Sequence, residues 1–336
     1  MLGSRRRAGL ACALASALAL AGAFTASASA AASASTCRNW TGGPPPGPGS
    51  RGNVLLGVTV LAPCNAWAVG YQSGTGTVST LIEHWNGSAW AVVPSPNPGT
   101  GIVDLLRSVR GVSPTDIWAV GSFSDGNGDR TLIVHWNGTA WKQMASPTPG
   151  GDATLSAVTA TSSGNAWAVG RAFRSTGDTS LILHWNGTAW KQLTSPNPGA
   201  SNDITAVAAS SKSDAWAVGI ATDNGIDQTL ILRWNGKRWT HIASPDQGGS
   251  TNDNDLAGVT VVSVADAWAV GIFASGQHRQ TLILHWNGSR WARVASPNRG
   301  TADQLLGVSA RSAGNLWAVG TYFDGTVEQP LAVHCC

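Results

Sequence analysis

The sequence predicts an all-β fold, a six-bladed β-propeller with four antiparallel strands in each blade. Three observations favour it. A motif of about fifty residues recurs along the chain, and each copy divides into short apolar segments that end at Gly, Asn or Pro. The composition disfavours helices, because the 336 residues include 41 Gly and 16 Pro but only two Met and two Glu. Charged residues make up 12% of the chain, about half the usual fraction of roughly 25%.

The repeat is marked by tryptophan at three fixed positions. The string Trp-Ala-Val-Gly occurs six times, a second Trp follows 18 residues later in the first five copies, and a third Trp follows five residues after the second. Constant spacing within units and variable spacing between them indicates one supersecondary module per repeat. The first-position residues are Trp67, Trp118, Trp167, Trp216, Trp268 and Trp317.

Each unit contains four predicted strands. The first two are typified by Leu55–Val60 and Ala66–Gly70, and the third by Leu132–Trp136. The fourth begins at the third Trp and ends at a Ser-Pro pair, since proline cannot donate to a strand ladder. The Asn-Gly pair between strands three and four predicts a type I′ hairpin turn. Four short antiparallel strands in a repeat of this length are typical of a propeller blade.

The last blade is predicted to be closed by an N-terminal strand. The sixth unit ends where its third strand should turn, so it has no fourth strand of its own. Trp40 is followed by proline at the same two spacings as Trp90, and it stands at the expected distance before Trp67. We therefore expect the segment around Trp40 to pair with residues near 331–334, in one propeller over residues 37–336.

Four cysteines remain outside the leader described below, and their register predicts a disulfide at this closure. Cys37 is expected to pair with Cys336 in preference to Cys335. Cys64 lies in a loop on the same face and is a candidate partner for the other terminal cysteine. The alternative is that the terminal cysteines are free or pair between molecules.

Residues 1–30 are predicted to be a signal peptide, with cleavage possible up to residue 34. Three arginines precede an apolar, Ala-rich stretch over residues 8–24, and small-x-small sites follow it. A transmembrane anchor is the alternative, but the apolar run is short. Loss of the leader removes the excess positive charge, so nucleic acid is not an expected partner. We expect a secreted, extracellular, bacterial protein without a membrane anchor, and a monomer.

The repeated polar residues are predicted to be structural, and so are most of the tryptophans. His stands one residue before the second Trp in four units and in the same place at His334, whereas Arg233 takes that place in the fourth unit. An Asn or Asp stands two residues before each first-position Trp, so we expect a hydrogen bond between it and the His, with Asp214 and Arg233 as a charged version. One His per blade cannot converge on one metal ion, so no metal or other cofactor is expected.

The variable loops after the second strand are the predicted ligand-binding surface, since the fixed positions describe a scaffold. Asp125, Asn127 and Asp129 alternate as in the first half of a calcium loop, without the Glu at its twelfth position, and are the one calcium candidate. Asp104, Asp203, Asp255 and Asp303 precede first strands near the mouth of the channel, or are turn formers. The ligand-binding candidates are Asp125, Asn127, Asp129, Arg171, Arg174, Asp178, Asp223, Asp227, His278, Arg279, Asp324 and Glu328.

The order of motifs resembles the kelch-type repeats of galactose-oxidase-like propellers. Ala-Trp-Ala-Val-Gly is followed by His-Trp-Asn-Gly-x-x-Trp and then by Pro, over about residues 37–336. The sequence departs from that pattern at two places. Kelch units have a Gly pair where this chain has Val69-Gly70, and they have Tyr-Asp where this chain has Trp85-Asn86. The resemblance implies a propeller closed by an N-terminal strand but no activity, since such folds include a copper oxidase, sugar-processing enzymes and binding proteins. The paired tyrosines of the copper oxidase have no counterpart, as only Tyr71 and Tyr322 exist.

No catalytic set emerges from the motifs. The chain lacks the Gly-x-Ser-x-Gly and His-Glu-x-x-His patterns, and Glu83 stands where other units have Val or Leu. We therefore expect a secreted, non-catalytic binding propeller whose loops contact a glycan or a protein surface. The alternative is an extracellular enzyme acting on polysaccharide through loop aspartates, which requires two carboxylates within roughly 5 to 10 Å of each other.

Overall fold

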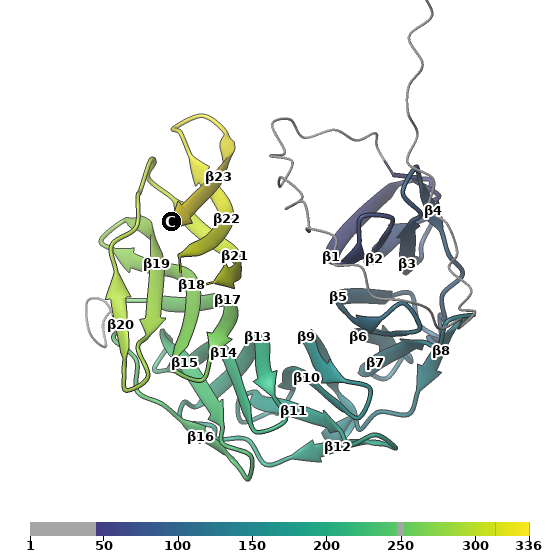
Figure 1. Ribbon diagram of the computed structural model, residues 1–336, viewed down its shortest axis with the longest axis horizontal. Helices are drawn as coiled ribbons and strands as arrows, with labels where there is room; N and C mark the ends of the chain where they lie inside the picture. The colour runs from purple at the N-terminus through teal and green to yellow at the C-terminus, as the bar shows by residue number, and fades with distance from the viewer. Residues whose placement is uncertain (1–44, 247–251, 313, 336) are drawn as a thin grey trace, which may run out of the picture.

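The computed structural model describes residues 45–246, 252–312 and 314–335, which form six antiparallel sheets around one axis (Figure 1). Five sheets have four strands in sequence order, and the sixth has three strands within the described residues. The six-bladed propeller predicted from the repeat is confirmed. One 3-10 turn, η1 (Pro149–Gly151), is the only helical element of these ranges. No helix in them is long and apolar enough to cross a bilayer.

The strands of each blade run from the axis outward. The innermost strands are β1 (Gly52–Ala62), β5 (Asp104–Ser113), β9 (Ala153–Ser162), β13 (Ser201–Ser211), β17 (Asn254–Ser263) and β21 (Asp303–Ser312). The second strands are β2 (Asn65–Ser73), β6 (Asp116–Ser124), β10 (Asn165–Ala172), β14 (Asp214–Asp223), β18 (Asp266–Ser275) and β22 (Asn315–Phe323). The third are β3 (Val78–Trp85), β7 (Asp129–Trp136), β11 (Thr179–Trp185), β15 (Ile226–Trp234), β19 (His278–Trp286) and β23 (Glu328–Cys335). The outermost are β4 (Trp90–Val92), β8 (Trp141–Met144), β12 (Trp190–Leu193), β16 (Trp239–His241) and β20 (Trp291–Val294).

This topology gives the ring two faces. The loops between second and third strands and the connections from fourth to first strands lie on one face, which we call the mouth face. The loops between first and second strands and the Asn-Gly turns lie on the other, the turn face. The innermost strands of neighbouring blades pack side by side from β1 to β21 (Figure 1). Residues at the mouth-face ends of these strands therefore surround the channel.

Tryptophans join each blade to the next. The ring of Trp118 on β6 lies 5.0 Å from that of Trp185 on β11 and 5.2 Å from that of Trp190 on β12, the second contact being edge-on at 86°. The same three-ring contact recurs between blades 1 and 2, 3 and 4, and 4 and 5. Trp118, Trp167 and Trp216 are almost fully buried. The prediction that most tryptophans belong to the core is confirmed.

The Asn-Gly turn is a four-residue loop, so the predicted type I′ turn is wrong. Trp85 and Trp90 form the last pair of β3 and β4, which leaves residues 86–89 in the loop. Gly87 has a φ of +97°, whereas Asn86 has no positive φ, and a type I′ turn needs a positive φ at both central residues. The Asn86 side chain instead accepts hydrogen bonds from the backbone N–H groups of Ser88 and Ala89. Asn is required here as a cap for the loop.

The segment after each fourth strand is held by a repeated contact. In blade 1 the backbone N–H of Thr80 donates to Asn97 Oδ1 at 2.8 Å, and the Thr80 hydroxyl donates to the carbonyl of Pro96. The same backbone bond occurs in blades 2 to 5. The Ser-Pro-Asn motif that ends the fourth strand therefore also positions the chain as it turns inward on the mouth face.

The two end blades carry apolar side chains that neighbouring blades would otherwise cover. Trp317 on β22 is 51% exposed, although its counterparts in blades 1 to 4 are buried, and Val58 and Val60 on β1 are also exposed. Beside the edge strand β23, a cavity of about 360 Å³ is lined by Trp268, Val333 and Cys335, among others. The residues predicted to close the ring, Trp40, Cys37 and Cys336, lie outside the described residues.

Cys335 is exposed and carries no disulfide, so the prediction that Cys335 takes part in a disulfide is wrong. Its position at the end of β23 matches that of the second Trp in other blades, and the residue ends the sheet without facing another described cysteine. The pairing of Cys37 with Cys336, and a disulfide role for Cys64, stay predictions.

Glu83 is an exception to the apolar pattern of the third strands. It is fully buried on β3, and neither carboxylate oxygen has a hydrogen-bond partner. Val134 and Leu183 occupy the same place in blades 2 and 3. Burial raises the pKa of Glu83, because the charged form loses its hydration without a compensating partner.

Trp40→Ala is expected to lower the free energy of unfolding by about 3–5 kcal/mol, because the predicted closing strand places Trp40 in the cavity against Trp268. Urea unfolding of the purified protein measures this. Trp141→Ala, which empties the equivalent place beside Trp67, is the matched control with a similar expected loss. An unchanged unfolding midpoint for Trp40→Ala alone would contradict the closing strand.

Glu83→Leu is expected to raise the free energy of unfolding at pH 7 by about 1–3 kcal/mol, since it removes an unpartnered buried carboxylate. The pKa of Glu83 is raised above its ordinary 4.5 in the folded protein. Because the unfolded chain then loses its proton at a lower pH than the folded protein, the free energy of unfolding of the wild type falls as pH rises from about 4.5 to the folded-state pKa. Unfolding midpoints measured from pH 4 to pH 8 should fall less steeply in Glu83→Leu. The exposed Glu328→Gln serves as the control, and equal slopes in both variants would refute the assignment.

Candidate functional site

Two aspartates stand at equivalent places on neighbouring inner strands at the mouth face. Asp203 on β13 pairs with Ile220, and Asp255 on β17 pairs with Ile272, each partner lying four residues after the first Trp of its blade. Because β13 and β17 pack side by side, both carboxylates come from adjacent blades at one level of the channel. The repeat does not require them, since Leu105 and Gln304 occupy this place in blades 2 and 6.

The residue before this place has a structural role. Asn202 Oδ1 accepts the N–H of Gly199 at 3.0 Å, and its amide donates to the Gly199 carbonyl at 2.7 Å. Asp104 accepts from Gly99, and Asp303 accepts from Gly300, in the corresponding connections. Asp104 and Asp303 are therefore buried turn formers, one place before the position of Asp203 and Asp255, although Asp104 Oδ1 is also buried without a partner within the described residues.

Asp203 belongs to a group of charges that we call the mouth cluster, made of Arg107, Arg171, Asp178 and Asp203. Arg171 Nη1 lies 3.2 Å from Asp203 Oδ2 and 3.6 Å from Asp178 Oδ2. The other oxygen of Asp203 is buried without a partner. Burial raises the pKa of Asp203, and the positive charge of Arg171 acts in the opposite direction. The guanidinium thus favours the ionised form of this carboxyl.

Among the described residues, Asp255 has no such counter-charge within ion-pair distance. Burial, together with the negative charges of Asp227 and Asp253, raises its pKa to about 6, and the positive charge of Arg279 acts in the opposite direction. Its Oδ1 atom is buried without a hydrogen-bond partner. Burial raises the pKa of both carboxyls, but their charged neighbours differ: Arg171 contacts Asp203, whereas Asp255, with a pKa of about 6, keeps a proton in mildly acidic solution.

Arg107 was not among the residues predicted from the sequence. It occupies the bulge of β5 between Leu106 and Ser108, where the register with β6 shifts, and its Nη1 donates to Ser122 Oγ at 3.1 Å. The charges of Asp129, Arg171 and Asp203 all act on it. The corresponding bulge in blade 4 carries Thr205, so an alignment of the six repeats would have singled out Arg107.

The structure brings some of the predicted loop residues together at the mouth and leaves others apart. Arg171 and Asp178 belong to the mouth cluster, Asp129 acts on Arg107, and Asp227 and Arg279 act on Asp255. Arg174 instead donates to the carbonyls of Pro149 and Phe173, and Asp223 accepts the N–H of Ala200. Asp324 caps its own turn, and His278 and Glu328 are exposed.

The calcium candidate has another explanation. Asp125 Oδ2 lies 2.6 Å from Arg130 Nε, and its Oδ1 accepts the N–H of Asn127, which makes an ordinary Asx turn. A guanidinium on the carboxylate opposes cation binding. Within the described ranges no group of three or more His, Cys, Asp or Glu residues is arranged to hold a metal ion.

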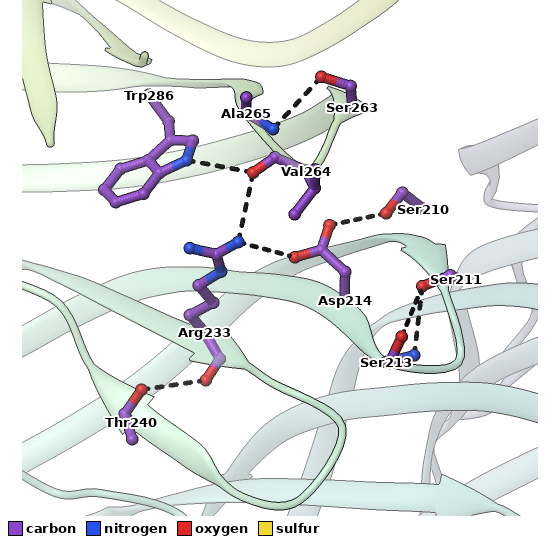
Figure 2. Close-up of polar contacts among 10 residues, drawn as sticks. All are labelled: Ser210, Ser211, Ser213, Asp214, Arg233, Thr240, Ser263, Val264, Ala265 and Trp286. Atoms are coloured by element: carbon purple, nitrogen blue, oxygen red, sulfur yellow. Dashed lines mark hydrogen bonds and ion pairs between the residues drawn. The ribbon is translucent and has the colours of Figure 1, made fainter. Parts of the chain in front are cut away.

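The repeated pair of His and Asn or Asp lies on the turn face and confirms the predicted hydrogen bond in every blade. The distance from His Nε2 to the Asn or Asp Oδ1 is 3.1, 2.7, 2.9, 3.0 and 3.3 Å in blades 1, 2, 3, 5 and 6. In blade 4 Arg233 Nη2 lies 3.3 Å from Asp214 Oδ1 (Figure 2). The same nitrogen donates to the Val264 carbonyl of blade 5 at 3.2 Å, so Arg233 also links two blades.

Comparisons with known proteins show the fold and no family. No protein-family model and no curated protein matches the chain. Among solved structures, an α-L-arabinanase from Penicillium chrysogenum, complexed with arabinobiose, is 11% identical with a TM-score of 0.50, over 86% of this chain and 96% of that one. The Hadza microbial sialidase Hz136 is 10% identical with a TM-score of 0.51, over 78% of this chain and 62% of that one. The kelch resemblance stays a prediction.

The titration of Asp255 tests the charges described above. In carboxyl-carbon NMR Asp255 should titrate near pH 6, and Asp227→Asn should lower that pKa because a neighbouring negative charge is lost. Asp324→Asn, which changes a turn in blade 6, should leave it unmoved. An ordinary pKa for Asp255 in the wild-type protein would contradict the burial of its carboxyl.

Proposed function

We propose that the protein is an extracellular enzyme that acts on polysaccharide at the mouth of its central channel. The observation that carries this proposal is the pair Asp203 and Asp255, at one level of adjacent inner strands and each with a buried, unpartnered oxygen. The repeat can be built without either residue. Unpartnered carboxylate oxygens are costly to bury, so residues that the scaffold does not need and that carry this cost are candidates for chemistry.

The different surroundings of the two carboxyls assign them different roles. Cleavage of a glycosidic bond needs one protonated carboxyl to donate a proton to the departing oxygen and one ionised carboxyl to act as base or nucleophile. Asp255, with a pKa of about 6 and acidic neighbours, is the proton donor. Asp203, which contacts Arg171, is the ionised partner, and Arg171 together with Asp178 holds it in place.

The structural likenesses fit this proposal without carrying it. The arabinanase and the sialidase are named for action on glycans, and each shares the propeller fold with this chain. At about 10% identity this likeness shows the fold alone, so the assignment depends on the carboxylates. The predicted signal peptide would deliver the protein to where polysaccharides occur.

A non-catalytic glycan-binding propeller is the second candidate. It is favoured by the ion pairs of the mouth cluster, because Arg171 already contacts both Asp178 and Asp203 and holds them rigid before any ligand arrives. Preorganised polar groups of this kind suit recognition as well as catalysis.

The test is release of new sugar ends from a panel of neutral and acidic polysaccharides, beside a glycan-binding array with the same protein. Activity is expected, and Asp255→Asn and Asp203→Asn should each lower kcat/KM by about 10²–10⁴-fold, since each removes an acid–base group. Asp266→Asn is the matched control on the turn face, where Asn is the residue that blades 1, 3 and 6 use. Binding on the array without release by any substrate would favour the second candidate.

The pH dependence gives a second check on the roles. Activity should fall as pH rises through about 6, because Asp255 then loses the proton that it donates. Asp227→Asn should move that fall to lower pH, in parallel with the pKa of Asp255. A profile that does not respond to Asp227→Asn would remove Asp255 from the role of donor.

A further inference from the structure

The turn face has a cavity between blades 2 and 3 that the proposed function does not use. Its volume is about 650 Å³, and it is lined by Asp116 and His135 of blade 2 and by Ser162, Ser163 and Trp185 of blade 3, among others. The mouth cluster lies at the opposite ends of the strands. Any ligand of this cavity is therefore separate from a substrate at the channel mouth.

Asp116 is the residue of this cavity whose hydrogen bonds are incomplete. Its Oδ1 atom lies 2.7 Å from His135 Nε2, but its Oδ2 atom is buried and has no partner. Asp116 as a whole is 9% exposed, its side chain is 12% exposed, and the residue lines the cavity. A carboxylate oxygen in this state is stabilised by any hydrogen-bond donor that enters.

Blade 4 shows how the same carboxylate is satisfied elsewhere in the molecule. Asp214 Oδ2 accepts the hydroxyl of Ser210 at 2.6 Å, and its Oδ1 is contacted by Arg233 (Figure 2). Val112 lines the cavity of blade 2 at the place that corresponds to Ser210, so Asp116 Oδ2 has no hydroxyl to accept. Blade 2 therefore lacks the hydroxyl donor of blade 4, and His135 takes the place of Arg233 at Asp116 Oδ1.

Arg233 also shows which chemical group fits between two blades on this face. Its guanidinium donates to the Val264 carbonyl, and its central carbon lies 4.9 Å from the ring of Trp216 and 5.3 Å from that of Trp286. In Figure 2 the Val264 carbonyl receives the indole N–H of Trp286 as well as Arg233. One carbonyl, one carboxylate and two indole rings surround the cation.

The cavity between blades 2 and 3 has the counterparts of these groups. The Ser163 carbonyl accepts the indole N–H of Trp185 at 2.9 Å, as the Val264 carbonyl accepts that of Trp286. The shorter His135 stacks on Trp118 at 4.1 Å and forms no contact with blade 3 of the kind that Arg233 makes with blade 5. The acceptors that surround Arg233 are thus repeated here, with the His135 imidazole on Asp116 Oδ1 in place of the guanidinium.

We propose that this cavity binds a guanidinium group, the side chain of an arginine presented by a protein or peptide partner. A guanidinium offers five N–H donors and no acceptor, which matches the Asp116 carboxylate and the Ser163 carbonyl. Its planar cation also stacks on an indole face, here that of Trp185. A lysine ammonium group is not planar, so it does not stack on an indole in this way. It also lacks the fixed, forked arrangement of N–H donors with which a guanidinium can reach both acceptors at once.

Two peptides that differ in one group test the proposal, one with arginine and one with citrulline, its uncharged analogue. Titration calorimetry with the full mature protein should show binding of the arginine peptide and at least tenfold weaker binding of the citrulline peptide. N-acetyl-arginine amide distinguishes a free arginine ligand from a peptide, since its binding should be weaker than that of the peptide. Equal affinity for the arginine and citrulline peptides would overturn the proposal.

Three variants locate the site. Asp116→Asn should reduce arginine-peptide binding at least tenfold. The variant is expected to fold normally, because Asn65 and Asn165 occupy the same place in blades 1 and 3. His135→Arg should abolish binding, because the protein's own guanidinium then occupies the cavity as Arg233 does in blade 4. Asp266→Asn, the same change in blade 5, should bind as the wild type does. Wild-type affinity in either Asp116→Asn or a folded His135→Arg would contradict the site.

Discussion

The packing of one indole edge against another at the four seams between blades 1 and 5 is the interaction on which the rest of the structure depends. A second-strand Trp from one blade inserts against two Trp side chains of the next, with ring centroids 4.8 to 5.5 Å apart. Burying an indole of about 200 Å² is worth roughly 5 kcal/mol before conformational entropy is subtracted. Because the same contact is repeated, blades 1 to 5 pack against one another in the same way, whereas the loops differ from blade to blade.

The polar repeats complete this scaffold at both faces. On the mouth face, buried Asn and Asp side chains accept the N–H groups of the connections that enter each first strand, as Asn202 does for Gly199. On the turn face, the His and Asx pairs tie second strands to third strands. These bonds satisfy backbone and side-chain groups that would otherwise be buried without partners. Residues outside the repeat are therefore the informative ones.

Buried carboxylate oxygens without partners occur both at repeated positions and outside the repeat. Within the described residues they occur in Asp203 and Asp255 at the mouth, in Asp116 on the turn face, in Glu83 on β3 and in Asp104 at the start of β5. The scaffold has alternatives for each, because other blades place Leu, Gln, Asn or Val at the matching positions. Each of these carboxylates lowers stability where it stands, and the first three lie where a ligand can contact them.

The sequence by itself determined the parts of this protein that depend on spacing along the chain. The Trp period predicted six blades, the Asn-Gly and Ser-Pro pairs predicted where third and fourth strands end, and the offset between Asx and His predicted their hydrogen bond, including Asp214 with Arg233. All of these join residues within one repeat. The type I′ turn was wrong because the loop holds two more residues than that turn allows.

Only the tertiary structure decided which unrepeated residues meet. Arg171 of blade 3 contacts Asp203 of the neighbouring blade 4, and a bulge in β5 places Arg107 in the mouth cluster. The negative charge of Asp227 in blade 4 raises the pKa of Asp255 in blade 5. These contacts depend on the angle between neighbouring sheets and on side-chain direction at the channel. Spacing along the chain specifies the place of a residue within its blade, whereas the approach of two blades depends on how their indoles pack.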